Sequence, residues 1–327
     1  MKAAWYDQTG TAKDVLKTGE MEKPEPNKGE VRVKIHCSGI NPSDTKNRSG
    51  WQGMKMQFDR VIPHNDGAGV IDAVGEGVDS SRVGERVWLY ETQLDRPFGT
   101  AAEFAVLPSE QAVTLPDTTD FAEGACLGAP AMTAHYCVFA DGAVEGKTVL
   151  VAGGTGAVGN YAVQLAKWGG AKVIATVGSD EKKAIATNSG ADEVINYKSE
   201  DVAKRVQEIT DGEGVDRIIE VAFATNLKVN QEIIKPNGAI ATYSSGESNK
   251  PEVPFLPFLL KNTLVRFVLV YAMPKQAHRA AAKDITTCLK EGFFKHQIAQ
   301  KLPLTEIVAA HEAVENGEGI GNIVVDI

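Results

Sequence analysis

The chain has 327 residues, of which 43% are hydrophobic and 24% are charged. These values are close to the average for folded globular proteins, so they exclude a disordered chain, and the length is enough for two ordinary domains. The 34 Lys and Arg residues are outnumbered by 43 Asp and Glu, which gives a net charge of −9. This acidic surplus argues against nucleic acid as the main partner, because that affinity comes largely from basic side chains.

Cysteine usage and hydropathy favour a cytoplasmic protein that does not enter a membrane. The four cysteines form no Cys-x-x-Cys pair, as is typical of thiols in a reducing compartment. An acid, Asp7, precedes any apolar segment, so we expect no secretory signal. The most apolar stretch, 254–273, is interrupted by Pro257, Lys261 and Arg266, which indicates a loop and a buried strand.

Short β-strands dominate the first third of the chain. Polar and apolar residues alternate over 30–36, which is the period of a half-buried strand. Glycine-rich segments at 66–77 and 83–89 punctuate further short strands, and this pattern favours a small barrel or sandwich. The last residues, 322–327, predict one more strand, which we expect to return to this β-rich domain.

Strands alternate with helices from about residue 121 onward. A helix is predicted over 121–139, and the strands that follow cover 148–152, 172–177, 193–197, 215–222, 238–243 and 263–271. This alternation implies an α/β fold with a doubly wound parallel sheet, the Rossmann arrangement. The predicted domains are a dinucleotide-binding domain over 124–270 and a β-rich domain made of 1–123 and 271–327.

The strongest chemical signal is a G-x-G-x-x-G turn that directly follows a predicted strand and opens a predicted helix. We expect Gly154 to permit the tight turn, Gly156 to let the backbone approach a pyrophosphate, and Gly159 to let the helix pack closely. The helix N-terminus also offers free N–H groups and the positive end of its dipole. The predicted dinucleotide contacts are Gly154, Thr155, Gly156, Ala157, Val158 and Gly159.

The end of the second strand of this domain predicts which dinucleotide binds. Proteins that choose NAD usually place an acid there, and the segment 177–179 contains none. Lys182 follows within a turn, and its ammonium group can pair with a 2′-phosphate. Asp180 and Glu181 argue the other way. We predict NADPH as the cofactor, with contacts at Gly178, Ser179, Lys182 and Tyr197.

Together these motifs resemble the medium-chain dehydrogenase/reductase superfamily, and more closely its zinc-independent quinone oxidoreductase branch, which includes zeta-crystallin. The segments that carry the resemblance are 39–44, 48–50, 66–70, 84–87, 133–134, 151–159 and 195–197. The resemblance implies that the β-rich domain is GroES-like and that the chain is an NADPH-dependent quinone oxidoreductase. It also implies a homodimer, joined along the predicted strand 263–271.

The zinc-dependent branch of this superfamily has Cys, His and Cys ligands, which motif matching places at Asn41, Asn65 and Ala129. None of these is a normal zinc ligand, so we predict no metal, and a shifted pair of His64 with Cys37 is the alternative. Zinc acts as a Lewis acid on an alcohol or carbonyl. Without it, a quinone or a similar conjugated acceptor is the easier target for direct hydride transfer.

The resemblance also implies residues that line the site. Asn41 takes a vacated ligand position, where its amide can donate to an oxygen, and a plain turn residue is the alternative. Trp51 and Tyr271 are expected to line the acceptor site, with packing as their alternative role. Related reductases have a tyrosine where this chain has Lys46, so no proton donor is predicted. The remaining predicted cofactor contacts are Asn41, Thr133, Tyr243, Ser244 and Ser245.

Two other functions stay open. The chain is alternatively a reductase of the double bond of an enal, enone or enoyl thioester. The sequence does not separate this activity from quinone reduction, because the loops 49–59 and 89–98 set the shape of the acceptor. An alternative of another class is a non-catalytic crystallin-like or RNA-binding protein. The intact glycine turn and the acidic charge argue against that role. The expected partner is therefore a small-molecule quinone or conjugated carbonyl, with no nucleic acid and no membrane.

Overall fold

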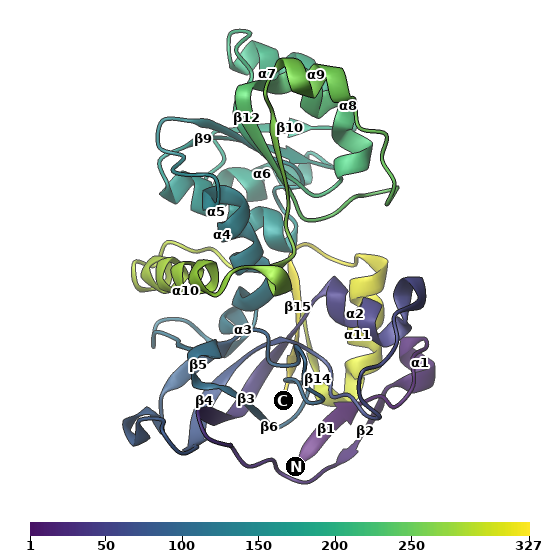
Figure 1. The fold of residues 1–327 in the computed structure, drawn as a ribbon, viewed down its shortest axis with the longest axis vertical. Helices are drawn as coiled ribbons and strands as arrows, with labels where there is room; N and C mark the ends of the chain where they lie inside the picture. The colour runs from purple at the N-terminus through teal and green to yellow at the C-terminus, as the bar shows by residue number, and fades with distance from the viewer. The chain divides into compact units, whose positions relative to one another are not determined.

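The computed structural model describes residues 1–327 and divides into two compact units. Unit 1 comprises 1–130 and 282–327, and unit 2 comprises 131–281 (Figure 1). Helix α10 (Lys275–Lys290) begins in unit 2 and ends in unit 1. No helix is both long enough and apolar enough to cross a bilayer.

Unit 2 is built on a six-stranded sheet in the order β10-β9-β8-β11-β12-β13. All neighbouring strands in it run parallel. The strands are β8 (Thr148–Val151), β9 (Lys172–Val177), β10 (Glu193–Asn196), β11 (Val215–Glu220), β12 (Ile234–Thr242) and β13 (Leu264–Phe267). The strand order reverses between β8 and β11, so the carboxyl ends of these two strands flank the point where such sheets bind ligands. The doubly wound sheet predicted from the sequence is confirmed.

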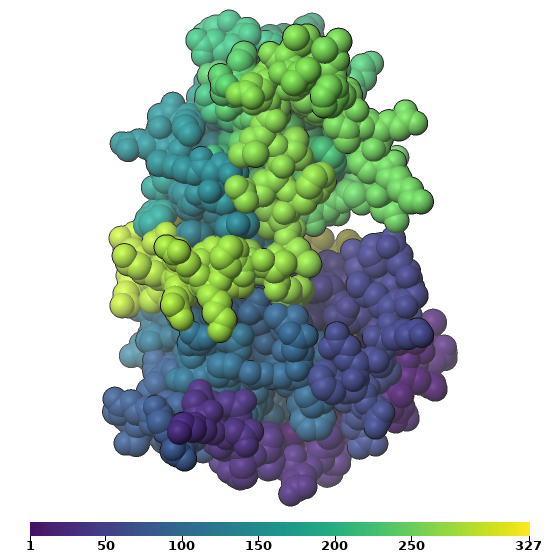
Figure 2. All heavy atoms as spheres, viewed as in Figure 1, coloured from purple at the N-terminus to yellow at the C-terminus, as the bar shows by residue number.

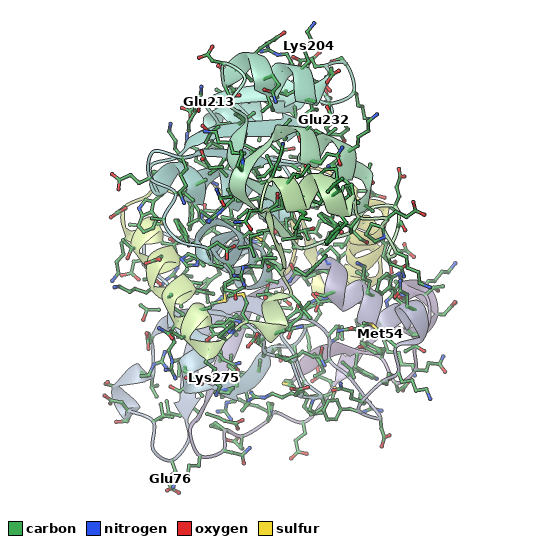
Figure 3. All side chains as sticks on the ribbon, turned by 45° about the horizontal axis from the view of Figure 1, so that its top comes forward. Met54, Glu76, Lys204, Glu213, Glu232 and Lys275 are labelled. Carbon is green, nitrogen blue, oxygen red and sulfur yellow. The ribbon has the colours of Figure 1, made fainter.

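Helices pack on both faces of this sheet (Figure 1). They are α4 (Met132–Phe139), α5 (Ala157–Trp168), α6 (Glu181–Asn188), α7 (Val202–Ile209), α8 (Phe223–Ile233) and α9 (Phe255–Leu260). One core cluster takes a buried aliphatic side chain from each of five strands: Leu150, Ile174, Ile195, Ile218 and Ile240. Burying each contributes about 1.5–3 kcal/mol, which fixes the strand ends in register. Charged side chains such as Lys204, Glu213 and Glu232 point outward (Figure 3).

Unit 1 contains a seven-stranded sheet in the order β14-β15-β3-β4-β5-β7, with β6 also paired to β3, and a separate pair β1-β2. The strands are β1 (Lys2–Trp5), β2 (Lys17–Glu20), β3 (Glu30–Ile40), β4 (Asp66–Val74), β5 (Arg86–Leu89), β6 (Phe104–Pro108), β7 (Ala112–Thr114), β14 (Ile298–Pro303) and β15 (Asn322–Asp326). Its helices are α1 (Ala12–Val15), α2 (Pro42–Ser49), α3 (Phe121–Gly124) and α11 (Ile307–Asn316). The last strand, β15, pairs antiparallel with β3, which confirms that the end of the chain returns to the β-rich part.

Two predicted elements were wrong. The helix predicted over 121–139 is broken into α3, a π-helical turn over Leu127–Ala131 and α4. Pro130 lies in that turn, where its missing N–H and its ring prevent a regular helix. The strand predicted over 263–271 ends at Phe267, and Tyr271 lies instead in a 3-10 turn over Val270–Ala272.

Candidate functional site

The glycine turn of unit 2 lies between β8 and α5, as predicted. Its left-handed residue is Gly153, with φ of 68°, so the tight turn assigned to Gly154 belongs to the preceding glycine. Gly154 is needed for another reason, since a Cβ there would lie 2.8 Å from the Cβ of Ala175 on β9. The Gly154 N–H also donates to the carbonyl of Thr176 at 2.9 Å. The turn is therefore pressed against the neighbouring strand.

Gly156 and Gly159 are glycines for different reasons. A Cβ on Gly159 would lie 2.1 Å from the carbonyl oxygen of Gly153, so α5 can begin this close to the turn only with glycine. A Cβ on Gly156 would meet nothing nearer than that oxygen at 3.4 Å, an ordinary contact. The protein itself therefore does not require glycine at 156, and the space beside this exposed backbone is open to a ligand.

The first turn of α5 supplies the chemistry of a phosphate site. Its N-cap, Gly156, makes no side-chain hydrogen bond, and the turn contains no acidic residue. The first N–H groups of a helix have no partner within the helix and carry its positive dipole end. Open backbone at Gly156 and uncapped N–H groups over 157–159 fit a pyrophosphate. The residues present therefore fit a dinucleotide.

The end of β9 carries the residues predicted to distinguish NADPH from NADH. Gly178 lies under Tyr197, because a Cβ there would come within 2.7 Å of the tyrosine hydroxyl oxygen. Lys182, at the start of α6, has no ion pair. Its neighbour Lys183 is committed to Glu200 at 2.9 Å. Lys182 is thus the cation of this pair that is available to a ligand.

Asp180, the acid that argues against NADPH, already has partners within the protein. It accepts a hydrogen bond from the side-chain amide of Asn196 at 3.0 Å and pairs with Lys183 at 3.3 Å. These partners hold the pKa of the Asp180 carboxyl below its ordinary value. Its exposed side chain is therefore occupied within the protein.

The loops after β11 and β12 are tied together at the same edge of the sheet. The N–H groups of Phe223 and Ala224 donate to the carbonyls of Ser244 and Ser245, at 3.2 Å and 2.8 Å. The Tyr243 N–H donates to the carbonyl of Glu220 at 3.1 Å. Backbone hydrogen bonds between the two loops thus hold three predicted cofactor contacts in place: Tyr243, Ser244 and Ser245.

Glu220, which was not among the predicted site residues, holds this pair of loops together. Its buried carboxylate accepts hydrogen bonds from the Ala222 N–H at 2.6 Å and from the side-chain amides of Asn226 and Asn230, at 3.0 Å and 2.9 Å. An acid at the end of an apolar strand was the available signal, because a buried carboxylate requires such donors. Elsewhere in unit 2, Thr133 is buried in the first turn of α4.

In unit 1, Asn41 is the N-cap of α2 and is nearly buried. Its N–H donates to the Asp44 carboxylate at 2.8 Å, and its side chain accepts from the Asp44 N–H, which together form a capping box. The Asn41 Nδ2 donates to Oδ2 of Asp66 at 2.7 Å. The orientation of the Asn41 amide is therefore fixed from both ends.

Two buried aspartates connect the three positions at which the zinc-dependent branch has its ligands. Asp66 accepts from Asn41 and from the Ala129 N–H, the latter at 2.7 Å, and Asp44 accepts from the Asn65 amide at 3.2 Å. Burial raises the pKa of Asp44 to about 7 and that of Asp66 to about 8. The structure thus brings Asn41, Asn65 and Ala129 into one hydrogen-bonded network.

The structure does not favour the alternative ligand pair of His64 and Cys37. Both ring nitrogens of His64 have partners, the Ser38 hydroxyl at 2.8 Å and Nε2 of His311 at 2.9 Å. The Cys37 thiol lies 3.3 Å from the Asp326 carboxylate. No group of three or more His, Cys, Asp or Glu side chains is arranged to hold a metal ion.

Trp51 lies in the turn that follows α2, with part of its ring exposed. The ammonium group of Lys46 lies 4.7 Å from the centre of that ring, a cation–π contact. Met54, also exposed, follows on the same loop (Figure 3). This loop therefore presents apolar surface with one cation beside it.

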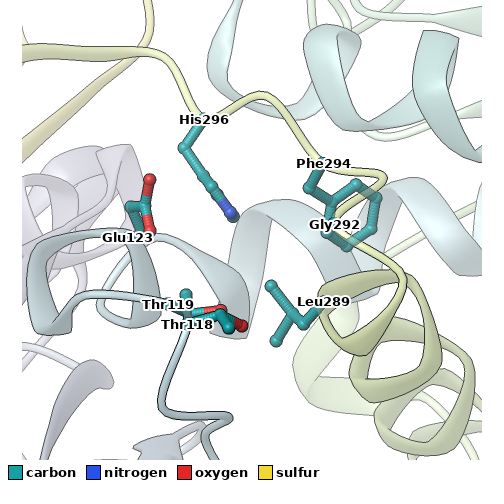
Figure 4. Close-up of a pocket in the computed structure, with 7 residues that line it drawn as sticks. All are labelled: Thr118, Thr119, Glu123, Leu289, Gly292, Phe294 and His296. Atoms are coloured by element: carbon teal, nitrogen blue, oxygen red, sulfur yellow. The ribbon is translucent and has the colours of Figure 1, made fainter.

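Unit 1 contains a cavity of about 120 Å³ (Figure 4). It is lined by Thr118, Thr119, Glu123, Leu289, Gly292, Phe294 and His296. None of the predicted site residues is among them. The cavity therefore gives no support to a site assignment.

Comparison with known proteins places the chain in a family. An alcohol dehydrogenase GroES-like domain matches residues 27–117, and a zinc-binding dehydrogenase domain matches 157–286. The quinone oxidoreductase of Rattus norvegicus is 32% identical over 94% of this chain and 92% of its own length. The chain belongs to the medium-chain dehydrogenase/reductase superfamily, in its quinone oxidoreductase branch. The quinone oxidoreductase of Pseudomonas aeruginosa is 31% identical over 91% of both chains.

Further proteins are similar to this chain in sequence or in fold. A 2-haloacrylate reductase of a Burkholderia species is 30% identical over 93% of both chains. A crystal structure of an NAD-dependent alcohol dehydrogenase matches with a TM-score of 0.90 and 28% identity over the whole of both chains. A mycobacterial protein, Rv1454c, solved as a complex with NADPH, matches with a TM-score of 0.85 and 25% identity over both whole chains. The predicted GroES-like and Rossmann folds are thus confirmed.

Proposed function

We propose that this protein is an NADPH-dependent quinone oxidoreductase that passes a hydride directly to a quinone or a similar conjugated acceptor. The observation that carries the proposal is the turn before α5, where Gly156 leaves open backbone beside uncapped N–H groups. The rat and Pseudomonas relatives, both named quinone oxidoreductases, support the choice of acceptor. In this proposal residues 124–270 bind the nucleotide, and 1–123 with 271–327 supply acceptor contacts.

Lys182 supports NADPH over NADH. Its ammonium group has no partner within the protein, whereas the nearby carboxylate of Asp180 is engaged by Asn196 and Lys183. An available cation and an occupied acid favour a 2′-phosphate over a 2′-hydroxyl. The NADPH complex of the mycobacterial relative points the same way.

Bound NADPH supplies a hydride that an electron-poor ring or alkene can accept without a Lewis acid. Of the three positions matched to zinc ligands, two carry amides and one a methyl group, so we propose no catalytic zinc. The Asn41 amide, with one N–H committed to Asp66, donates the other to the acceptor oxygen and stabilises its developing charge. Trp51 and Tyr271 contact the flat acceptor.

We further propose that the protein is a homodimer whose second copy covers the edge of unit 2. β13 is an edge strand, and its Phe267 is 73% exposed. Phe255 and Leu260 of α9 are 73% and 77% exposed, and this green segment lies at the surface in Figure 2. An unpaired edge beside large exposed apolar side chains fits an interface between copies. The buried, unpaired cysteines fit a cytoplasmic location.

A second candidate is the reduction of a conjugated carbon–carbon double bond. It is favoured by the 30% identity to the 2-haloacrylate reductase. The exposed Lys46 beside Trp51 fits an acceptor with a carboxylate, because a cation next to an aromatic wall recognises a charge on a flat molecule.

The test is NADPH oxidation with a panel of quinones, enones, a haloacrylate and simple alcohols. The proposal predicts turnover with quinones and a clear preference for NADPH over NADH. Turnover with the haloacrylate and not with quinones would establish the second candidate. Tight NADPH binding without turnover on any acceptor would favour the non-catalytic role.

A further inference from the structure

The carboxyl group of Asp66 is buried at the start of β4, with 1% of the residue exposed. Both of its donors, the Asn41 amide and the Ala129 N–H, reach the same oxygen, Oδ2. The other oxygen, Oδ1, has no hydrogen-bond partner. A buried carboxyl with one oxygen unpartnered is costly, and such a group in a folded protein calls for an explanation beyond packing.

The position of this carboxyl is fixed on several sides. A Cβ on Gly128 would lie 2.1 Å from Oδ1, so the chain passes close to that oxygen only because residue 128 is glycine. The Thr100 hydroxyl donates to the Asp66 backbone carbonyl at 2.6 Å, which holds the main chain as well. Asp66 therefore cannot turn its carboxyl away from Asn41 without moving the surrounding backbone.

The fixed position of the Asp66 carboxyl determines the orientation of the Asn41 amide. Its side chain accepts from the Asp44 N–H in the capping box, and one of its two N–H groups is taken by Asp66. The amide plane is thus defined at both ends, and one N–H, at a known orientation, remains uncommitted.

We propose that Asp66 is a positioning residue which, anchored by the Ala129 N–H, holds the Asn41 amide so that its uncommitted N–H meets the acceptor oxygen. This inference rests on the proposed function. Asp44 differs from Asp66, because both of its oxygens accept N–H groups, from Asn41 and Asn65. Asp44 therefore stabilises the start of α2, whereas the side chain of Asp66 accepts only from the Asn41 amide and from the Ala129 N–H.

A double-mutant cycle on kcat with a quinone tests this. N41A and D66A should each lower kcat by about tenfold or more, as loss of a charge-stabilising donor does. The double variant should be no slower than N41A, because Asp66 acts only through Asn41. D66N should retain most of the activity, since its carbonyl can accept both N–H groups. KM for NADPH should change less than kcat, and D120N, at the exposed cap of α3, is the matched control.

D66L keeps the test decisive if D66A fails to fold, because leucine is close to aspartate in shape but accepts no hydrogen bond. It leaves the Asn41 amide without the acceptor that orients it, so kcat should fall as in D66A while D66N stays active. Melting curves of D66L and D66N show whether both variants are folded. Multiplicative losses in the cycle, wild-type kcat in N41A, or wild-type kcat in folded D66L would each overturn the positioning role. If the wild type itself reduces no acceptor, the proposed function fails instead.

Discussion

Replacement of Asp66 by asparagine should stabilise the protein increasingly as the pH rises. Burial, with a further contribution from Asp44, raises the pKa of the Asp66 carboxyl from 3.8 to about 8. A carboxyl whose folded pKa lies above its unfolded value stabilises the folded state fully below the unfolded pKa. That contribution is lost as the pH rises towards the folded pKa. Asparagine has nearly the same shape and does not titrate, so D66N should escape this loss.

The size of the stability difference follows from the number of pH units between the unfolded and the folded pKa of Asp66. Each pH unit between the two pKa values corresponds to about 1.4 kcal/mol. From pH 4 to pH 7, the free energy of unfolding of D66N should therefore gain about 4 kcal/mol relative to the wild type. At pH 4 the two proteins should be similar, because the wild-type carboxyl is then neutral when folded.

Urea unfolding between pH 4.5 and pH 7.5 measures this difference. Tryptophan fluorescence is a suitable signal, because Trp88 on β5 is fully buried in the same unit as Asp66. D59N, at an exposed site, controls for the removal of one acid from the chain. A difference between D66N and wild type that stays constant across this pH range would refute the reasoning.

Three other predictions concern the nucleotide site and the thiols. G156A should fold normally but bind NADPH about 10- to 100-fold more weakly, because its Cβ would occupy the open space beside the backbone and hold the pyrophosphate away from the N–H groups. G159A should instead lose about 1–3 kcal/mol of stability. Calorimetry and melting curves distinguish the two variants, and equal NADPH affinity in G156A would contradict the phosphate assignment. K182Q should lower the preference for NADPH over NADH about tenfold in kcat/KM, whereas K183Q should leave that preference unchanged. An unchanged preference in K182Q would contradict the assignment of Lys182 to the 2′-phosphate. The four thiols, those of Cys37, Cys126, Cys137 and Cys288, should react slowly with a thiol reagent in the native protein and fully in the denatured protein. Burial shields these thiols and raises their pKa. Fast labelling of the native protein would contradict this.

The strands of unit 2 were predictable because buried parallel strands are almost continuously apolar. β9 was predicted with its observed bounds, Lys172–Val177, and the glycine turn follows β8 as its pattern indicates. The break at Pro130 was missed because the apolar spacing on both sides reads as one helix. The left-handed turn residue was misplaced by one, since Gly153 precedes the motif.

The network around Asn41 was not predictable in this detail. Asn41 and Asp66 are 25 residues apart, and Asp66 and Ala129 are 63 apart. Their contacts depend on how β3, β4 and the turn before α4 meet, and no local pattern encodes that meeting. Motif matching identified the three positions, but only the structure shows two aspartates connecting them.

We propose that hydride passes from NADPH to a quinone without help from a metal. Quinone-dependent NADPH oxidation by the purified protein, before and after exhaustive dialysis against a chelator, tests it most directly when metal content is measured on the same samples. We predict an unchanged kcat with substoichiometric zinc in both samples. Activity that is lost on chelation and restored by Zn²⁺ would contradict the claim.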